Sequence, residues 1–234
     1  MIPIRQNCEN CNVLFKSFFN KLAKNDLIDL SEKKNCTLYK KGQAIFIAGT
    51  RPNGIYCINK GKVKIYKTGG YGKDQIIRFV LPGDLLGLRS FFCDRNYTST
   101  AVAIEDSILC FIGREDFQSL LEKYPQITNS VITSLSDLLD EANIKVTSLA
   151  QKPVRERLAE TLLTLNKIFK PDTPSSSKHS VVTLSRKDIA NLVGTATETI
   201  IRLLSEFKNE NLIAIKSRKI TILNTKELQR IANL

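Results

Sequence analysis

The feature that most constrains this chain is a change in the spacing of its apolar residues near residue 114. Between 36 and 112, short runs rich in Ile, Val, Tyr and Phe end at glycines. One of them, Lys62–Lys67, alternates polar and apolar side chains strictly, as a half-exposed strand does. Beyond 114 the apolar residues recur at steps of three and four, the period of a helix. A β-rich half is therefore followed by a helical half.

The β-rich half is expected to form an antiparallel roll. Several short strands with regular turn signals favour a sandwich or a barrel-like roll over a parallel sheet. A helix is expected before them, over Phe15–Lys33. The expected strands are Ala44–Ala48, Gly54–Asn59, Gly61–Lys67, Gln75–Leu81, Thr98–Ile104 and Ile108–Ile112.

A long helix is expected over residues 123–152, because an apolar stripe continues there for about three heptads. Ile132 and Leu139 widen this stripe. Such a stripe fits a helix that packs on its own roll, a coiled-coil contact with a second copy, or both together. We expect one edge to contact the roll and the other to form a dimer seam. The candidate seam residues are Val131, Leu135, Leu138, Ala142, Val146 and Leu149.

The net charge of +12 is distributed unevenly along the 234 residues. Residues 151–234 carry 15 basic and 8 acidic side chains, although they form the shorter part. An excess of basic side chains of this kind indicates that the segment binds nucleic acid, an anionic membrane surface or an acidic partner. No apolar run reaches the roughly 18 residues of a membrane span, and the first residues lack the apolar stretch of a signal peptide. We therefore expect a two-module cytoplasmic protein that is not membrane-bound.

The most informative segment is 185–207. Ser185 followed by Asp188 predicts a helix start, and a second helix is expected over about 196–208. A small residue, a glycine four positions later and apolar residues six and nine positions after that glycine match the spacing of a helix-turn-helix. These residues are Ala190, Gly194, Ile200 and Leu203.

Two β runs after the second helix flank the basic turn 216–219, which predicts a wing that lies against phosphates. The second helix should read bases, because Arg bonds guanine and Glu accepts a bond from cytosine. Alternatively, Glu198 is a capping-box acid, and Arg202 forms an ion pair with Glu198. Base-reading candidates are Thr197, Glu198, Ile201 and Arg202; phosphate-contacting candidates are Ser185, Arg186, Lys187, Lys216, Arg218 and Lys219.

These motifs resemble the CRP/FNR superfamily, the cyclic-AMP-receptor and fumarate–nitrate-reduction regulators. The resemblance covers nearly the whole chain and is strongest in "TLSRKDIANLVGTATETIIRLLSEFKNENLI". It also includes "KKGQAIFIAG", "GIYCINKGKVKIYK" and "LPGDLLGLRSFF". It implies an α+β fold with a cyclic-nucleotide-binding-like jelly roll as the sensor over 1–122. A dimerisation helix over 123–152 and a winged helix-turn-helix over 153–234 would follow.

The resemblance further implies a homodimer on a two-fold-symmetric double-stranded DNA site, with recognition helices in successive major grooves. Activation through RNA polymerase, or repression by occlusion, would follow. No enzymatic activity is expected. A nucleotide-binding module without DNA function, or a membrane-surface protein, would leave residues 183–222 unexplained. A cysteine redox enzyme would need an activating group near a thiolate, and the only histidine, His179, lies in a Pro/Ser-rich loop.

The resemblance leaves the signal open. Cyclic-AMP binders carry a glutamate and an arginine where this chain has Leu88 and Thr98, so cyclic AMP in the usual pose is not expected. Arg89 and Ser90 are candidates for an alternative small-anion site; the other interpretation, which is preferred, is that Arg89 braces the roll or contacts the dimer helix. The candidate effector pocket comprises Gly83, Asp84, Leu88, Arg89, Ser90, Thr98 and Ser99.

Six cysteines without an export signal are expected to be thiols. The oxygen-sensing branch of the superfamily holds an iron–sulfur cluster on four cysteines, and Cys8, Cys11 and Cys110 match three of those positions. Ser17 stands at the remaining position, where another thiol would have to replace it. The alternatives for Cys8 and Cys11 are a zinc half-site, a redox pair, or an exposed and reduced N-terminus. Cys57 and Cys110 also fit small buried core residues.

Overall fold

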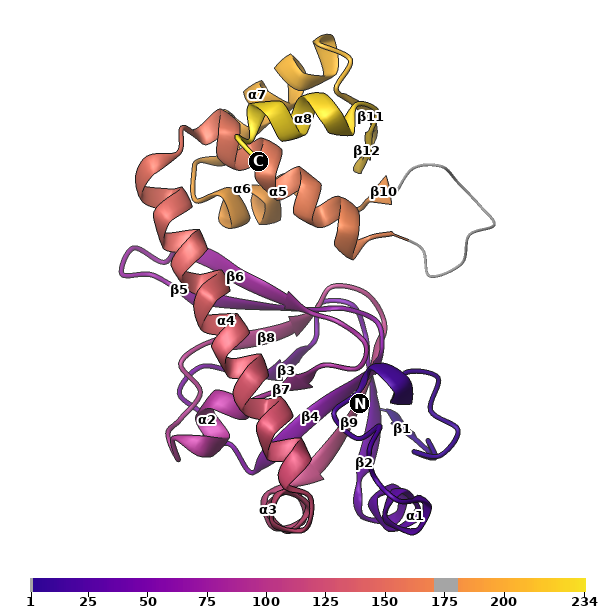
Figure 1. Cartoon of the computed structure of the whole chain (residues 1–234). Helices are drawn as coiled ribbons and strands as arrows, with labels where there is room; N and C mark the ends of the chain where they lie inside the picture. The colour runs from indigo at the N-terminus through magenta and orange to yellow at the C-terminus, as the bar shows by residue number, and fades with distance from the viewer. Residues whose placement is uncertain (1, 171–180) are drawn as a thin grey trace. The chain divides into compact units, whose positions relative to one another are not determined.

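The computed structural model describes residues 2–170 and 181–234, and the chain divides into two compact units, Met1–Glu141 and Ala142–Leu234. The loop expected around His179 lies outside the described residues. The helix α4 (Pro125–Gln151) is continuous in sequence across their boundary (Figure 1).

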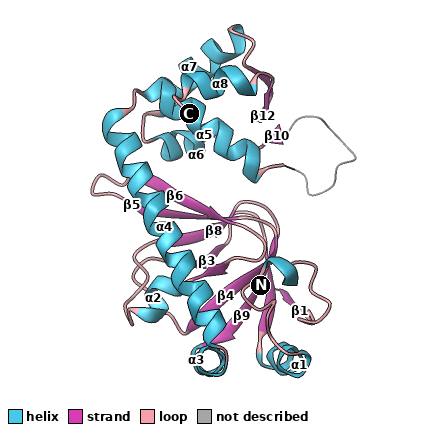
Figure 2. Ribbon diagram, in the orientation of Figure 1, coloured by secondary structure: helices cyan, strands magenta, loops and turns pink. Residues whose placement is uncertain are grey.

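Two antiparallel sheets form the first unit (Figure 2). The first sheet has the order β1 (Ile2–Ile4), β2 (Asn35–Tyr39), β9 (Ser107–Gly113), β4 (Gly54–Lys60) and β7 (Leu85–Leu86). The second has the order β3 (Ala44–Phe46), β8 (Thr100–Ala103), β5 (Val63–Thr68) and β6 (Asp74–Val80). All six expected strands are present. Strands β1, β2 and β7 were not predicted, because β1 and β7 are very short and β2 has no clear apolar period.

The short helices of the first unit are η1 (Leu14–Lys16), α1 (Lys24–Lys33), α2 (Leu88–Phe92) and α3 (Arg114–Lys123). The helix expected over Phe15–Lys33 is therefore wrong in its first half. Ser17 interrupts it, because its hydroxyl donates to the Leu14 carbonyl at 2.9 Å and accepts from the Phe19 amide at 3.2 Å. Such local side-chain bonds compete with helical backbone bonds.

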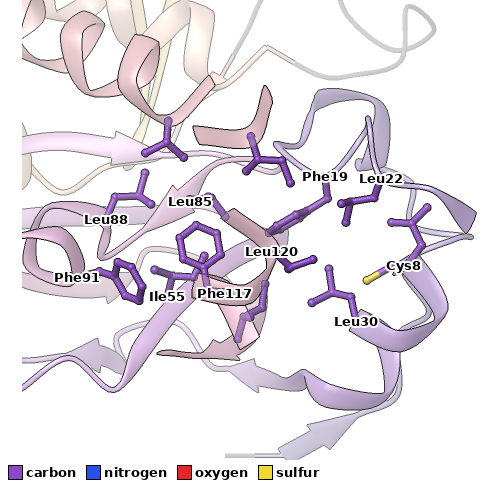
Figure 3. Close-up of a cluster of buried hydrophobic side chains, with 14 residues drawn as sticks. Cys8, Phe19, Leu22, Leu30, Ile55, Leu85, Leu88, Phe91, Phe117 and Leu120 are labelled. Atoms are coloured by element: carbon purple, nitrogen blue, oxygen red, sulfur yellow. The ribbon is translucent and has the colours of Figure 1, made fainter. Parts of the chain in front are cut away.

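Alternating side chains give the five-stranded sheet two apolar faces. On one face Ile58, Leu86 and Leu109 join residues of the other sheet in a core between the sheets. On the opposite face Ile55 and Ile112 contribute to a second core with residues from the helices and the N-terminal segment (Figure 3). Leu14 of η1 packs against this core. Because the pleat has a period of two, neighbouring residues on one strand enter different cores.

The helix α4 divides its apolar stripe between two environments. Val131 is 1% exposed and belongs to the second core, and Leu135 packs against that core. The expectation that Val131 lies in a dimer seam is therefore wrong, because its own roll already covers it. Ile132, Leu139 and Val146 are 57%, 62% and 65% exposed, and they recur at steps of seven.

The second unit has a helical core beside a small sheet of order β10-β12-β11. The expected α5 (Val154–Ile168), α6 (Arg186–Val193) and α7 (Thr197–Asn209) are present, and so is the hairpin of β11 (Ile213–Lys216) and β12 (Lys219–Ile222). The additional elements are β10 (Val181–Val182) and α8 (Thr225–Ile231). The structure confirms the α+β fold with a roll, a long helix and a winged helix-turn-helix. Among the described residues, no helix combines the length and apolarity that a membrane span requires.

Candidate DNA-binding surface and cysteine pocket

The helix-turn-helix is formed by α6, a glycine turn and α7. Ser185 caps α6 by accepting a bond from the Asp188 amide at 3.0 Å. Gly194 ends α6 with φ of 74°, a conformation that glycine adopts without the strain of a Cβ. Its amide donates to the Ala190 carbonyl at 2.9 Å. On α7, Ile200, Leu203, Leu204 and Phe207 are buried, so the opposite face of the helix stays free.

That free face carries the base-reading candidates. Glu198 and Arg202 are exposed, Ile201 is 51% exposed and Thr197 is half-buried. Ala196 is the N-cap of α7 and makes no side-chain cap bond, so the capping-box alternative for Glu198 is not supported. The alternative ion pair between Arg202 and Glu198 is also wrong, because Arg202 pairs with Glu206 instead, at 2.6 Å.

The phosphate-contacting candidates lie at the start of α6 and on the hairpin of β11 and β12. Ser217 takes φ of 56° at the tip of the hairpin, and Lys216, Arg218 and Lys219 are exposed around it. At the start of α6, Ser185 and Lys187 are exposed, whereas Arg186 is half-buried. Partial burial lowers the pKa of Arg186 from its ordinary value. The predicted wing is therefore present, with its basic side chains at the tip.

Sequence reasoning missed two arginines on α5 that hold the helix-turn-helix in place. Arg157 donates from Nε to the Val193 carbonyl at 3.0 Å and from Nη2 to the Gly194 carbonyl at 3.3 Å. Arg155 forms ion pairs with Glu206 of α7 at 3.3 Å and with Glu210, the C-cap of α7, at 2.6 Å. No local pattern marks these residues, because their partners lie 36 to 55 positions away.

The structure places the seven effector candidates in different surroundings, from buried to exposed. Arg89 and Thr98 hydrogen-bond each other on the surface, which fits the bracing role for Arg89. Leu88 is 5% exposed and belongs to the second core, so it is not positioned to meet a ligand. The Asp84 carboxylate accepts from the Leu81 amide at 2.9 Å. Gly83 packs against Lys16, Ser90 is buried, and Ser99 is half-buried.

Aromatic side chains contribute to the interior of the roll. Phe46 and Tyr97 stack with ring centroids 3.7 Å apart, and Tyr56 lies 6.4 Å from Phe46. Burial raises the pKa of Tyr39 to about 12, and burial also raises the pKa values of Tyr56 and Tyr97. This packing places large side chains between the two sheets.

A cavity of about 30 Å³ lies on the other face of the five-stranded sheet, under the N-terminal segment. Cys8 is 7% exposed, and its amide donates to Ser31 Oγ at 2.7 Å. The alternative of an exposed N-terminus is therefore wrong for Cys8, which Figure 3 shows beside Leu30. The residues that line the cavity are Cys8, Cys11, Leu14, Ser17, Phe19, Leu30, Lys34, Cys57, Asn59, Cys110 and Ile112.

Cys36 and Cys110 form a disulfide between β2 and β9. The expectation of six thiols is therefore wrong for this pair. The two strands place these residues directly opposite each other, which brings the two sulfurs together. The remaining cysteines, Cys8, Cys11, Cys57 and Cys93, are free.

Cys8, Cys11 and Cys110, the three cysteines matched to an iron–sulfur site, cannot hold a cluster while Cys110 is in its disulfide. A cubic cluster takes four thiolates. The sulfur of Cys110 is bonded to Cys36, and the hydroxyl of Ser17 is bonded to backbone. Among the described residues, no group of three or more His, Cys, Asp or Glu side chains is arranged to hold a metal ion.

Comparison with known proteins supports both halves of the fold. The family model of the cyclic nucleotide-binding domain matches residues 37–124, and that of the Crp-like helix-turn-helix domain matches 156–231. The structure of FixK2 from Bradyrhizobium japonicum covers 85% of this chain and 96% of its own, with TM-score 0.73 and 24% identity. The regulator CLP from Xanthomonas campestris covers 87% of this chain and 100% of its own, with TM-score 0.76 and 20% identity.

The fold and the exposed α7 face define a DNA-binding regulator of transcription with a winged helix-turn-helix. The fumarate and nitrate reduction regulatory protein of Vibrio cholerae is 31% identical over 97% of this chain and 91% of its own. Its counterpart in Escherichia coli strain K12 is 30% identical over 97% of this chain and 90% of its own. The chain therefore belongs to the CRP/FNR family of transcriptional regulators.

Proposed function

We propose that this regulator binds a two-fold-symmetric DNA site as a homodimer and reads it with α7 in the major groove. The observation that carries this proposal is the exposed face of Glu198, Ile201 and Arg202 on a helix whose other face is buried. The basic wing tip and Lys187 supply phosphate contacts, which set the register of the protein on the duplex. Arg202 must leave Glu206 to donate two bonds to a guanine.

The proposed dimer seam runs along α4 and is narrower than the sequence indicated. Ile132, Leu139 and Val146 are exposed at heptad spacing, which is the arrangement of a coiled-coil contact. Leu138, Ala142 and Leu149 remain candidates beside them, and Leu135 lies at the edge against the roll. Burying three large exposed apolar side chains against a second copy would remove them from water.

We propose the cysteine pocket, rather than the surface around Arg89, as the sensing element. The pocket joins the N-terminal segment to the roll, and thiols from both line it. Membership of this family supports RNA polymerase as a further binding partner. Because the proposed DNA target is chromosomal, we also propose that the protein acts in the cytoplasm.

The DNA-reading proposal is tested by comparing Arg202→Ala with Lys187→Ala in a binding selection over randomised duplexes. Arg202→Ala should cost on the order of 1–3 kcal/mol and relax one base position. Lys187→Ala should weaken all sequences alike and reduce the salt slope by about one. If Arg202→Ala weakened every sequence equally, Arg202 would be a phosphate contact and the base-reading assignment would fail.

A further inference from the structure

One apolar side chain interrupts the exposed polar face of α7. Exposed residues recur there at steps of three and four, which places in one stripe along the helix Glu198, Ile201, Arg202 and Ser205. Ile201 is 51% exposed. Along α7, every residue of which the structure describes, it is the one exposed position with an apolar side chain. An isoleucine therefore stands in the middle of the surface proposed to read bases.

The fold does not require an isoleucine at this position. The helix already buries a complete apolar face without it, formed by Ile200, Leu203, Leu204 and Phe207. A β-branched side chain has a lower helix propensity than alanine or the unbranched polar residues, so it does not favour the helix either. Single exposed apolar residues are common on protein surfaces, so the exposure of Ile201 is not informative by itself. Its place beside two side chains that can bond base edges is informative.

The polar groups around Ile201 leave one kind of contact to it. Ser205 donates its hydroxyl to the Ile201 carbonyl at 3.0 Å, so that hydroxyl is held against its own helix. Arg202, once released from Glu206, offers donors, and the Glu198 carboxylate offers acceptors. Charged groups of either sign gain nothing from the methyl group of thymine, which is the apolar feature of the major groove. An isoleucine can cover that methyl group, and its restricted χ1 leaves little rotamer freedom to lose.

We propose that Ile201 is a specificity-determining residue that packs on the C5-methyl group of a pyrimidine in the major groove, and that this pyrimidine is thymine. The inference rests on the proposed function, because it requires α7 to lie in that groove. It adds to the half-site a base that the polar side chains leave open. 5-Methylcytosine carries the same methyl group on the same ring position, so it is the other source of this contact.

The place and size of the effect follow from the geometry of the helix and the duplex. Residues three apart on a helix have Cβ atoms about 5–6 Å apart, and base pairs stack about 3.4 Å apart. The thymine should therefore fall within about two base pairs of the base that Glu198 contacts. Covering one methyl group changes affinity about fourfold. A two-fold-symmetric site contains the contact twice, so losing it in both halves should weaken binding about fifteenfold.

The test uses the full chain and the synthetic duplex that the binding selection yields. Each thymine of the half-site is replaced in turn by uracil, which removes the C5-methyl group and keeps the base pair. We expect one thymine to be sensitive, with binding about fourfold weaker after replacement in one half-site and about fifteenfold weaker in both. At the same position 5-methylcytosine should bind no more tightly than thymine. Tighter binding of 5-methylcytosine would make modified cytosine the target and would overturn the assignment to thymine.

Three variants connect the methyl preference to Ile201. Ile201→Ser should bind the thymine and uracil duplexes alike, because its short polar side chain makes no apolar contact. Ile201→Val keeps a branched apolar group and should retain a preference for thymine. Ser205→Ala is the matched control, because Ser205 lies on the same stripe and its hydroxyl is bonded to its own helix. It should keep the full preference. Circular dichroism should show all three variants folded, since both positions are exposed.

Other results would also overturn the assignment, and they are distinguishable from a failure of the proposed function. If wild type bound every uracil duplex as tightly as the thymine duplex while Arg202→Ala still relaxed one base position, the methyl contact would be wrong and the base-reading face would stand. A thymine preference of Ile201→Ser equal to that of Ser205→Ala would assign the contact to another residue. If no duplex were selected at all, the proposed function would fail, and this inference with it.

Discussion

Arg157 is expected to hold the turn of the helix-turn-helix in its DNA-binding geometry. Its guanidinium donates to the Val193 and Gly194 carbonyls at 3.0 and 3.3 Å, and also to the Lys152 carbonyl at 2.8 Å. These carbonyls lie at helix ends, where no backbone amide of the same helix can satisfy them. Arg157→Ala therefore removes a shared donor from two chain segments at once.

The magnitude follows from the number and exposure of these bonds. Removing a charged donor costs roughly 1.5–3 kcal/mol per bond when the acceptor stays buried. Gly194 is exposed, so water can replace the lost donor at its carbonyl. The total cost of losing the Arg157 bonds is therefore lower than the sum over fully buried acceptors. We expect Arg157→Ala to destabilise the second unit by about 2–4 kcal/mol. The destabilisation caused by Arg157→Lys should lie between that of the wild type and that of Arg157→Ala, because an ammonium group lacks the planar fork of donors that reaches both carbonyls.

Hydrogen exchange of peptides from residues 186–209 measures this effect within the second unit. The matched control is Arg230→Ala, because Arg230 is exposed and bonds Glu227 on its own helix. That change should leave exchange protection of the second unit nearly unchanged, because the ion pair is exposed to solvent. DNA affinity of Arg157→Ala should fall without a change in base preference. If the two alanine variants exchanged within about 0.5 kcal/mol of each other, the positioning role of Arg157 would be refuted.

Four further predictions concern single positions. Gly194→Ala should destabilise the second unit by roughly 1 kcal/mol or more, since φ is 74°; unchanged exchange protection would contradict this. Leu139→Glu should give folded monomers in sedimentation, because the side chain is 62% exposed; persistent dimers would exclude this seam. Phe117→Ala should cost about 3–5 kcal/mol in urea unfolding of the first unit, because Phe117 is fully buried; a loss under 1 kcal/mol would contradict its core role. Hydrogen bonds from Lys123, and secondarily from Tyr124, lower the pKa of the Asp26 carboxyl in the folded protein. The stabilisation that the ionised carboxylate gives the fold is therefore present above its unfolded pKa of about 4 and is lost as the pH falls through its lower folded pKa. Asp26→Asn should remove this part of the acid dependence of unfolding, measured by urea unfolding at several pH values.

The order and type of most elements could be predicted because local patterns encode them. Strict alternation in Lys62–Lys67 corresponds to β5, and the Ala190–Gly194–Ile200 spacing corresponds to α6 and α7. The exposed residues of α7 followed from its helical period, because the buried positions leave one face free. The partner of Arg202 did not follow, since Glu198 and Glu206 are both four residues away and only packing selects between them.

The sequence by itself determined a β-rich half, a long helix and a helix-turn-helix with a basic wing, because apolar period, glycine and cap residues act over a few positions. Only the tertiary structure decided which cysteines meet. Cys36 and Cys110 are 74 positions apart, and their pairing depends on the register of β2 against β9. A slip of one residue would turn one of them to the other face, and register is set by non-local packing. The same packing folds Cys8 and Cys11 over Cys57, so the pocket exists only in the folded chain.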